Sequence, residues 1–92
     1  MTKTQEGTPN GNGIDGILAA AEAGDASAQL DLANRYHFGD GVGRDAEAAY
    51  RWMRRAADAG VAEAQSKVGY FLTCGLGVSP DPKGALRWFL KG

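Results

Sequence analysis

The sequence repeats itself with a period of 36 residues. Of the 34 residues from Ala23 to Ala56, twelve recur unchanged one period later, between Ala59 and Gly92. The recurring letters keep their order: Ala-Gly, Ala-Gln, Gly-x-Gly-Val and Asp-x-x-x-Ala-x-Arg-Trp. A period of this length indicates one supersecondary unit stacked on a copy of itself. The repeat therefore constrains the architecture strongly, while it says little about a partner.

Each copy of the unit carries the signals of two helices. Residues 26–38 lack glycine and are followed by Gly39, which suits a left-handed helix C-cap. Asp45 then occupies the N-cap position of a second helix, where its carboxylate can accept backbone N–H groups. The apolar residues of that helix fall on one stripe at helical spacing, namely Ala49, Trp52, Met53, Ala56 and Ala57.

The second copy uses the same devices. It predicts a helix over 62–74 that ends at Gly75, and a second helix that begins at Pro82 after Asp81. Proline at the first helical position loses no hydrogen bond, because that N–H has no partner inside the helix. A further helix is expected over 14–23, since its end matches the end of the second helix one period later. We interpret it as the tail of a degenerate earlier repeat that caps the stack.

These motifs resemble the Sel1-like repeat, a relative of the tetratricopeptide repeat. The resemblance covers residues from about 20 to 92 in two copies, although Ala33 stands where the family usually has glycine. It implies an all-α fold, a right-handed α/α solenoid of about five helices. It also implies a module that binds proteins or peptides, commonly as an adaptor, rather than an enzyme. The predicted parts are a flexible tail (1–13) and one repeat domain (14–92), which comprises a capping helix (14–23), repeat 1 (24–59) and repeat 2 (60–92).

The composition is that of one small domain. The formal net charge of −1 gives no strong attraction to nucleic acid or to an anionic membrane, so neither is expected as a partner. The lone Cys74 excludes an intramolecular disulfide and suits a reducing compartment. No apolar stretch approaches the ~18–20 residues of a membrane span, and residues 1–13 lack the pattern of a signal peptide. A cytoplasmic location is therefore expected.

Residues that could carry chemistry are too few to predict a catalytic or metal site. His37 is the only histidine, and together with Cys74 it supplies too few ligands for a metal centre. No nucleophile and base can be paired around it. The loop 39–43 resembles a glycine-rich phosphate loop, but it follows a helix rather than a strand. We therefore expect no catalytic residue, no metal and no cofactor.

Two further features have simple structural explanations. Trp52 and Trp88 occupy the same repeat position, so core packing is favoured over stacking on a ligand. Basic side chains recur along the second helices, but Glu47 precedes Arg51 by four residues. This spacing favours a solvated outer face with i,i+4 ion pairs over a surface for nucleic acid or an acidic partner. The basic residues concerned are Arg44, Arg51, Arg54, Arg55, Arg87 and Lys91.

The first helices offer the best candidate binding surface. In the tetratricopeptide architecture, which this chain resembles, the first helix of each pair lines the concave face. The two copies differ at every inward, non-core position, which suits a partner-reading surface, an unconstrained surface or packing between helices. Asn34 and Tyr70 can hydrogen-bond a peptide backbone, while Leu30 and Phe38 offer apolar anchors. We call the following set the first-helix face: Leu30, Asn34, His37, Phe38, Ser66, Tyr70 and Thr73.

The last helix offers a second candidate surface. Met53 and Arg54 of the first copy become Phe89 and Leu90 in the second copy. Burial of one large apolar side chain is worth roughly 1.5–3 kcal/mol, so an exposed set favours a homodimer or docking on a partner. Two alternatives stay open: Leu90 folds back over the preceding helix, or the sequence is a piece of a longer array. We call Leu86, Phe89 and Leu90 the C-terminal apolar end.

The expected function is a non-enzymatic interaction module that binds a peptide or protein segment on the first-helix face. An alternative is a small inhibitor or decoy that docks on a larger complex through the charged outer face or the C-terminal apolar end. A hydrolase is a third alternative, and it ranks last because no nucleophile and base can be paired.

Overall fold

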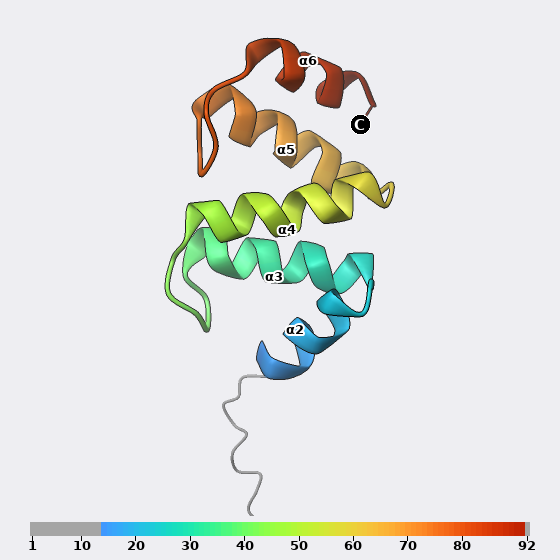
Figure 1. The fold of residues 1–92 in the computed structure, drawn as a ribbon, viewed down its shortest axis with the longest axis vertical. Helices are drawn as coiled ribbons and strands as arrows, with labels where there is room; N and C mark the ends of the chain where they lie inside the picture. The colour runs from blue at the N-terminus through green and yellow to red at the C-terminus, as the bar shows by residue number, and fades with distance from the viewer. Residues whose placement is uncertain (1–13, 92) are drawn as a thin grey trace, which may run out of the picture.

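The structure, a computed structural model, describes residues 14–91. It contains the helices α2 (Ile14–Glu22), α3 (Ala26–Phe38), α4 (Ala46–Asp58), α5 (Ala62–Cys74) and α6 (Pro82–Lys91). No strand occurs within this range. These five helices stack along the long axis of a molecule that measures 53 × 22 × 14 Å (Figure 1). The predicted α/α solenoid is therefore confirmed, while the tail predicted over 1–13 lies outside the described residues.

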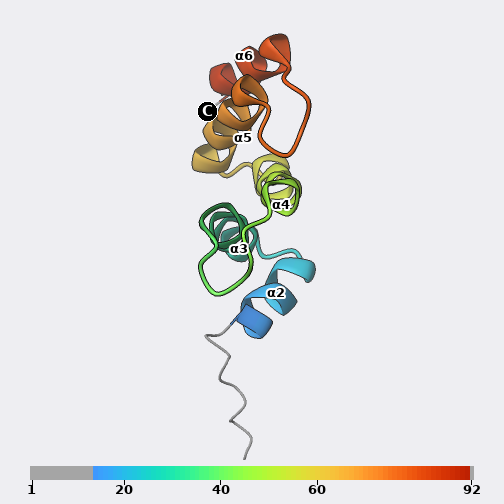
Figure 2. The same ribbon diagram turned by 90° about the vertical axis from the view of Figure 1, so that its left-hand side faces the viewer.

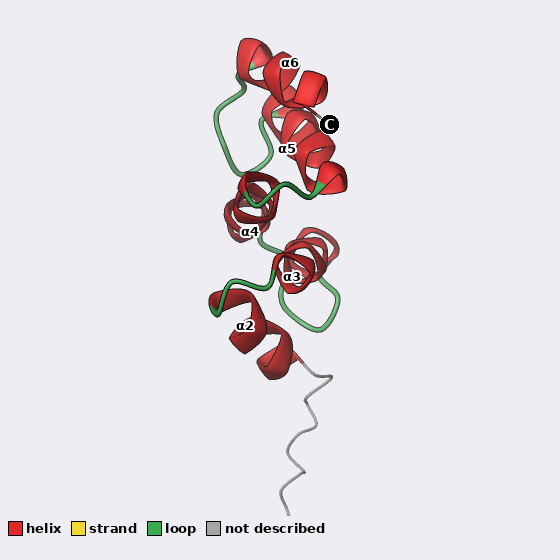
Figure 3. Ribbon diagram, turned by 90° about the vertical axis from the view of Figure 1, so that its right-hand side faces the viewer, coloured by secondary structure: helices red, strands yellow, loops and turns green. Residues whose placement is uncertain are grey.

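The helices alternate between two layers. Figures 2 and 3 show α3 and α5 on one side of the stack and α2 and α4 on the other. Each helix packs mainly on its neighbours in the chain, as expected of a solenoid in which every repeat contacts only the next. The two longer connections, 39–45 and 75–81, leave the stack on the same side (Figure 1).

The letters that repeat in the sequence make the same hydrogen bonds in each copy. Gly39 and Gly75 adopt left-handed conformations with φ of 75° and 72°, and their N–H groups donate to the carbonyls of Arg35 and Phe71. A side chain would be strained at both positions, which explains why glycine recurs there. The predicted C-caps are therefore confirmed.

The repeated aspartates cap the second helices. Asp45 Oδ1 accepts a hydrogen bond of 3.1 Å from the N–H of Ala48, and Asp81 Oδ1 accepts one of 3.0 Å from the N–H of Gly84. Each bond satisfies an N–H that has no partner inside the helix. Since α6 begins at Pro82, the predicted start of the last helix is also confirmed.

The repeated glutamines join neighbouring helices. Gln29 Nε2 donates to the carbonyl oxygen of Ala21 at 3.0 Å, and Gln65 Nε2 donates to that of Ala57 at 3.2 Å. Both acceptors lie in the last turn of the preceding helix, and each also accepts a backbone N–H from the glycine three residues further on, Gly24 or Gly60. The recurring Ala-Gln pair thus fixes the short turn between one unit and the next.

Small side chains allow the helices to pack closely. The largest fully buried side chains are few, and most other buried apolar positions are alanines. Trp52 and Trp88 are only half-buried, and each packs against this core from its edge. The largest fully buried side chains are Phe71, Leu32, Met53 and Val68.

A loop of the second repeat contacts the first repeat. Gly77 adopts a φ of 68°, and its α-carbon lies directly against the backbone of Ala46 and Glu47 at the start of α4. This contact brings the 75–81 connection onto the start of α4, as Figure 1 shows.

None of the helices in the described part of the chain is long and apolar enough to cross a membrane.

Candidate functional site

An aromatic cluster joins the two first helices. The ring centroid of His37 in α3 lies 4.6 Å from that of Phe38 and 5.1 Å from that of Phe71 in α5. The Phe71 ring in turn lies 6.2 Å from Tyr70 and 6.4 Å from Tyr50, which belongs to α4. Aromatic pairs at these separations attract one another beyond their burial. Three residues of the first-helix face are therefore brought together around Phe71.

Two members of this cluster are open to solvent. Phe38 is 69% exposed and Tyr70 is 50% exposed, whereas Phe71 between their helices is buried. Tyr70 contacts buried Phe71 directly, whereas Phe38 reaches it through the half-buried ring of His37. Exposed aromatic side chains held in this way are the usual anchors of protein interfaces.

The environment of His37 favours the neutral imidazole. Burial, followed by the positive charges of Arg44 and Lys67, lowers the pKa of His37 below its ordinary value of 6.5. The side chain is half-buried. At neutral pH it therefore presents an uncharged, flat ring beside Phe38, which suits an apolar or aromatic contact.

The other residues of the first-helix face differ in how far they are available to a partner. Leu30 packs against the core, so little of it is left for a partner. The Thr73 hydroxyl donates to the carbonyl of Gly69 at 2.9 Å. Ser66 is exposed, while Asn34 is half-buried and its Oδ1 is buried with no hydrogen-bond partner. A buried acceptor without a partner costs about 1–3 kcal/mol of stability.

A groove lies between the two second helices. It encloses about 330 Å³ and is bounded by α4 and α6, with Leu72 of α5 contributing to its wall. Pockets that hold small ligands start near this size. We call it the second-helix groove, and its lining residues are Tyr50, Arg54, Leu72, Asp81, Gly84, Arg87, Trp88 and Lys91.

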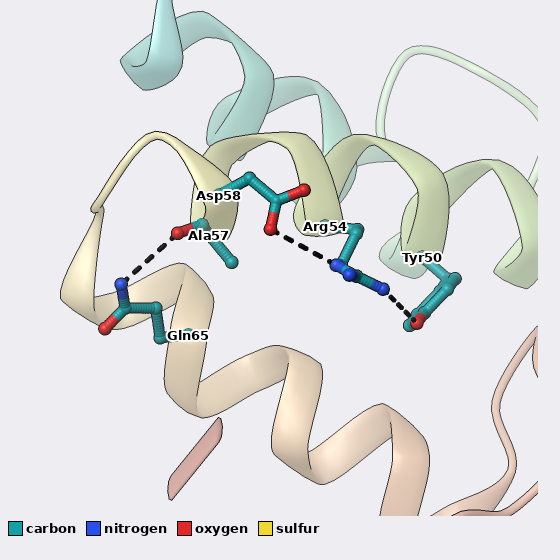
Figure 4. Close-up of polar contacts among 5 residues, drawn as sticks. All are labelled: Tyr50, Arg54, Ala57, Asp58 and Gln65. Atoms are coloured by element: carbon teal, nitrogen blue, oxygen red, sulfur yellow. Dashed lines mark hydrogen bonds and ion pairs between the residues drawn. The ribbon is translucent and has the colours of Figure 1, made fainter. Parts of the chain in front are cut away.

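Arg54 is fixed at the edge of this groove. Its Nε donates to Asp58 Oδ1 at 3.3 Å, and one terminal nitrogen lies 3.5 Å from the Tyr50 hydroxyl (Figure 4). The hydrogen bond to Tyr50, and then the hydrogen bond and charge of Asp58, raise the pKa of the Arg54 guanidinium. The guanidinium carbon lies 5.1 Å from the centre of the Trp88 ring in α6. Arg54 therefore links the two walls of the groove.

Sequence reasoning missed this groove. It predicted a solvated basic face with i,i+4 pairs, and such pairs do occur between Arg51 and Glu47 at 3.9 Å and between Arg54 and Asp58. It placed Trp88 in the core. One feature of the sequence could have indicated the groove: a basic residue directly precedes a tryptophan in both copies, as Arg51-Trp52 and as Arg87-Trp88.

The C-terminal apolar end is exposed. Leu86 and Leu90 are 58% and 77% exposed, and Phe89 is 46% exposed although its ring lies against Gly69 of α5. Leu86 and Leu90 are four residues apart in one helix, so they form a continuous apolar strip. Within residues 14–91, no group of three or more histidine, cysteine or acidic side chains is placed to hold a metal ion.

Comparison with known proteins matches the repeats and the fold of this chain. The family model of the Sel1 repeat matches residues 26–61 and 62–92. A Sel1 repeat protein from Oxalobacter formigenes has a similar structure, with a TM-score of 0.83 and 36% identity over 85% of this chain and 32% of its own. A protective antigen present in uropathogenic Escherichia coli strains, which displays an SLR fold, gives a TM-score of 0.82 and 35% identity over 85% of this chain and 17% of its own. The chain thus spans about a third or less of each of these two structures, and no curated protein matches it.

Proposed function

The chain belongs to the Sel1 repeat family, and from this premise we propose that it is an adaptor that binds an extended peptide segment of another protein on the first-helix face. Sel1 repeat proteins generally mediate protein–protein interactions, and their solenoid is typically a non-catalytic scaffold. The single observation that favours this face is the exposure of Phe38 and Tyr70 on a buried aromatic base.

The chemistry of the face suits an apolar or aromatic anchor flanked by peptide backbone. Phe38 and neutral His37 provide the flat apolar contact. The hydroxyl of Tyr70 can hydrogen-bond the backbone of the segment, and so can the Nδ2 group of Asn34, whereas the Asn34 Oδ1 is buried. With a surface this short, the area buried per partner is at most about 800 Å², so a few anchors must supply most of the affinity.

Selection from a phage-displayed random peptide library tests this proposal. Peptides selected on the unmodified chain should bind Phe38→Ala and Tyr70→Ala variants about tenfold more weakly or worse, as measured by calorimetry. Leu86→Ala serves as the matched control, since it removes a similarly exposed apolar side chain from another surface. Peptides whose affinity depends on Leu86 and not on Phe38 or Tyr70 would overturn the assignment of the face.

A second candidate function is self-association or docking through the C-terminal apolar end, as an inhibitor or decoy would do. It is favoured by the adjacent exposed side chains of Leu86 and Leu90. The occupant we propose for this surface is a second copy of the chain, because a two-fold contact would cover the same apolar patch on both copies at once. Light scattering over a wide concentration range should then show a dimer that Leu90→Arg dissociates. A monomer at all concentrations excludes self-association through this end.

A further inference from the structure

The second-helix groove concentrates positive charge in a chain whose overall charge is slightly negative. Arg54, Arg87 and Lys91 line it, against a single acidic residue, Asp81. The whole chain has a formal net charge of −1. The basic character of the groove is therefore local, and it does not follow from a generally basic surface.

Two of these cations lie against the same aromatic ring. The Arg54 guanidinium carbon lies 5.1 Å from the centre of the Trp88 ring, and the Lys91 ammonium nitrogen lies 5.2 Å from it. Both distances are within the range of favourable cation–π contact. An anion bound beside this ring would be attracted by both charges. The Trp88 ring thus helps to hold both cations at the groove.

The positive charge is only partly neutralised by the protein. Asp58 pairs with Arg54 at 3.3 Å, whereas Arg87 and Lys91 form no ion pair within residues 14–91. Asp81 lies at the start of α6, roughly 15 Å along the helix from Lys91, and its carboxylate caps Gly84. Lys91 therefore lies at the far end of α6 from Asp81, and Arg87 lies between them, roughly 9 Å along the helix from Asp81.

We propose that the second-helix groove binds an acidic peptide segment of a partner protein, with its carboxylates between Arg87, Lys91 and Arg54. This site is separate from the first-helix face and does not depend on the function proposed for that face. Arginine forks match carboxylates in two-point contacts, and the floor beside Leu72 accepts an apolar stem. Nucleic acid is the weaker fit, since duplex-binding proteins commonly engage about 6–10 phosphates and this groove offers three cations.

Trp88 supplies a direct optical signal. The chain has two tryptophans, so Trp52→Phe leaves Trp88 as the only indole. In that background, hexaglutamate should change the Trp88 emission in a saturable way, and added salt should weaken the binding. The Arg87→Glu change should weaken the binding about tenfold or more. Arg87→Gln, a milder change at an exposed site, should weaken it in the same direction with helicity unchanged by circular dichroism.

Arg51→Glu is the matched control, because Arg51 is the repeat equivalent of Arg87 and does not line the groove. It makes the same change of charge one period earlier and should leave the affinity for hexaglutamate nearly unchanged, as should Phe38→Ala. Equal losses in Arg51→Glu and Arg87→Glu would show non-specific attraction and overturn the proposal. Absence of a saturable signal would overturn it as well. So would tighter, Arg87-dependent binding of hexathymidylate, which would make the groove a nucleic-acid site.

Discussion

The ring of Phe89 in α6 lies directly on the α-carbon of Gly69 in α5. A Cβ added to Gly69 would come within 2.7 Å of Phe89 Cε1, so the ring occupies the space that any side chain would need. One period earlier the same two positions hold Ala33 and Met53, both fully buried. The two copies thus fill these two positions differently. The second copy has Gly69 and the wide ring of Phe89, and the first copy has Ala33 and the flexible side chain of Met53.

We therefore expect energetic coupling between these positions. Gly69→Ala should gain about 0.5–1 kcal/mol in helix propensity and lose more than this by displacing the Phe89 ring. Phe89→Met should be destabilising alone but neutral or favourable when combined with Gly69→Ala, because the double variant recreates the pair of the first repeat. Urea unfolding of the unmodified chain, the two single variants and the double variant should give a coupling free energy of about 1 kcal/mol. Additive effects would contradict this explanation of the contact.

Three glycines allow steric and conformational costs to be separated. Gly77 has a φ of 68°, and its Cβ would overlap the carbonyl of Ala46 and lie 2.6 Å from the backbone nitrogen of Glu47. Gly60 has a φ of 100° but open space around it, and Gly43 has open space and no positive φ. Alanine should therefore cost little at Gly43, about 1–2 kcal/mol at Gly60 and clearly more at Gly77. Thermal unfolding of the three variants checks this order, and equal costs at Gly60 and Gly77 would contradict the contact between repeats.

The paired glutamines should differ in importance although their hydrogen bonds are alike. Gln29 is buried and Gln65 is half-buried, while each donates to a carbonyl at the end of the preceding helix. Replacement by alanine should cost about 1–2 kcal/mol at Gln29 and about half of that at Gln65, where water can replace the lost donor. Ser66→Ala, at an exposed site beside Gln65, is the control for chemical denaturation. A larger loss at Gln65 than at Gln29 would show that burial does not set the cost.

The helix caps could be predicted from the sequence because each depends on a single residue at a single position. Gly39 and Asp45 were predictable caps, since a left-handed turn and an orphaned N–H have few chemical solutions. The second-helix groove could not be predicted in this way. It requires Arg54 and Lys91, nearly one period apart, to meet at Trp88, and this depends on the angle at which one repeat packs on the next. The candidate surface was identified from differences between the copies, whereas the anchoring role of Phe71 beneath it became visible only in three dimensions.

Protonation of His37 should oppose folding. Burial and the charges of Arg44 and Lys67 lower the pKa of His37 in the folded chain, whereas the unfolded chain retains a value near 6.5. Well above pH 6.5 the imidazole is neutral in both states, so the stability is fully present. As the pH falls below this value the unfolded state takes up the proton first, and stability is lost progressively until the pH has passed through the folded pKa.

Since His37 is the only histidine, its Hε1 resonance reports the folded pKa without ambiguity. We expect a titration midpoint below 6.5, and a rise of that midpoint in Lys67→Gln because one of the two repelling charges is removed. His37→Gln should show a smaller loss of unfolding free energy between about pH 7 and pH 5 than the unmodified chain, since the carboxylates titrate alike in both. A midpoint at or above 6.5 would mean that His37 is not shielded beside Phe38 and Phe71. In that case the first-helix face would present a cation to its partner at mildly acidic pH.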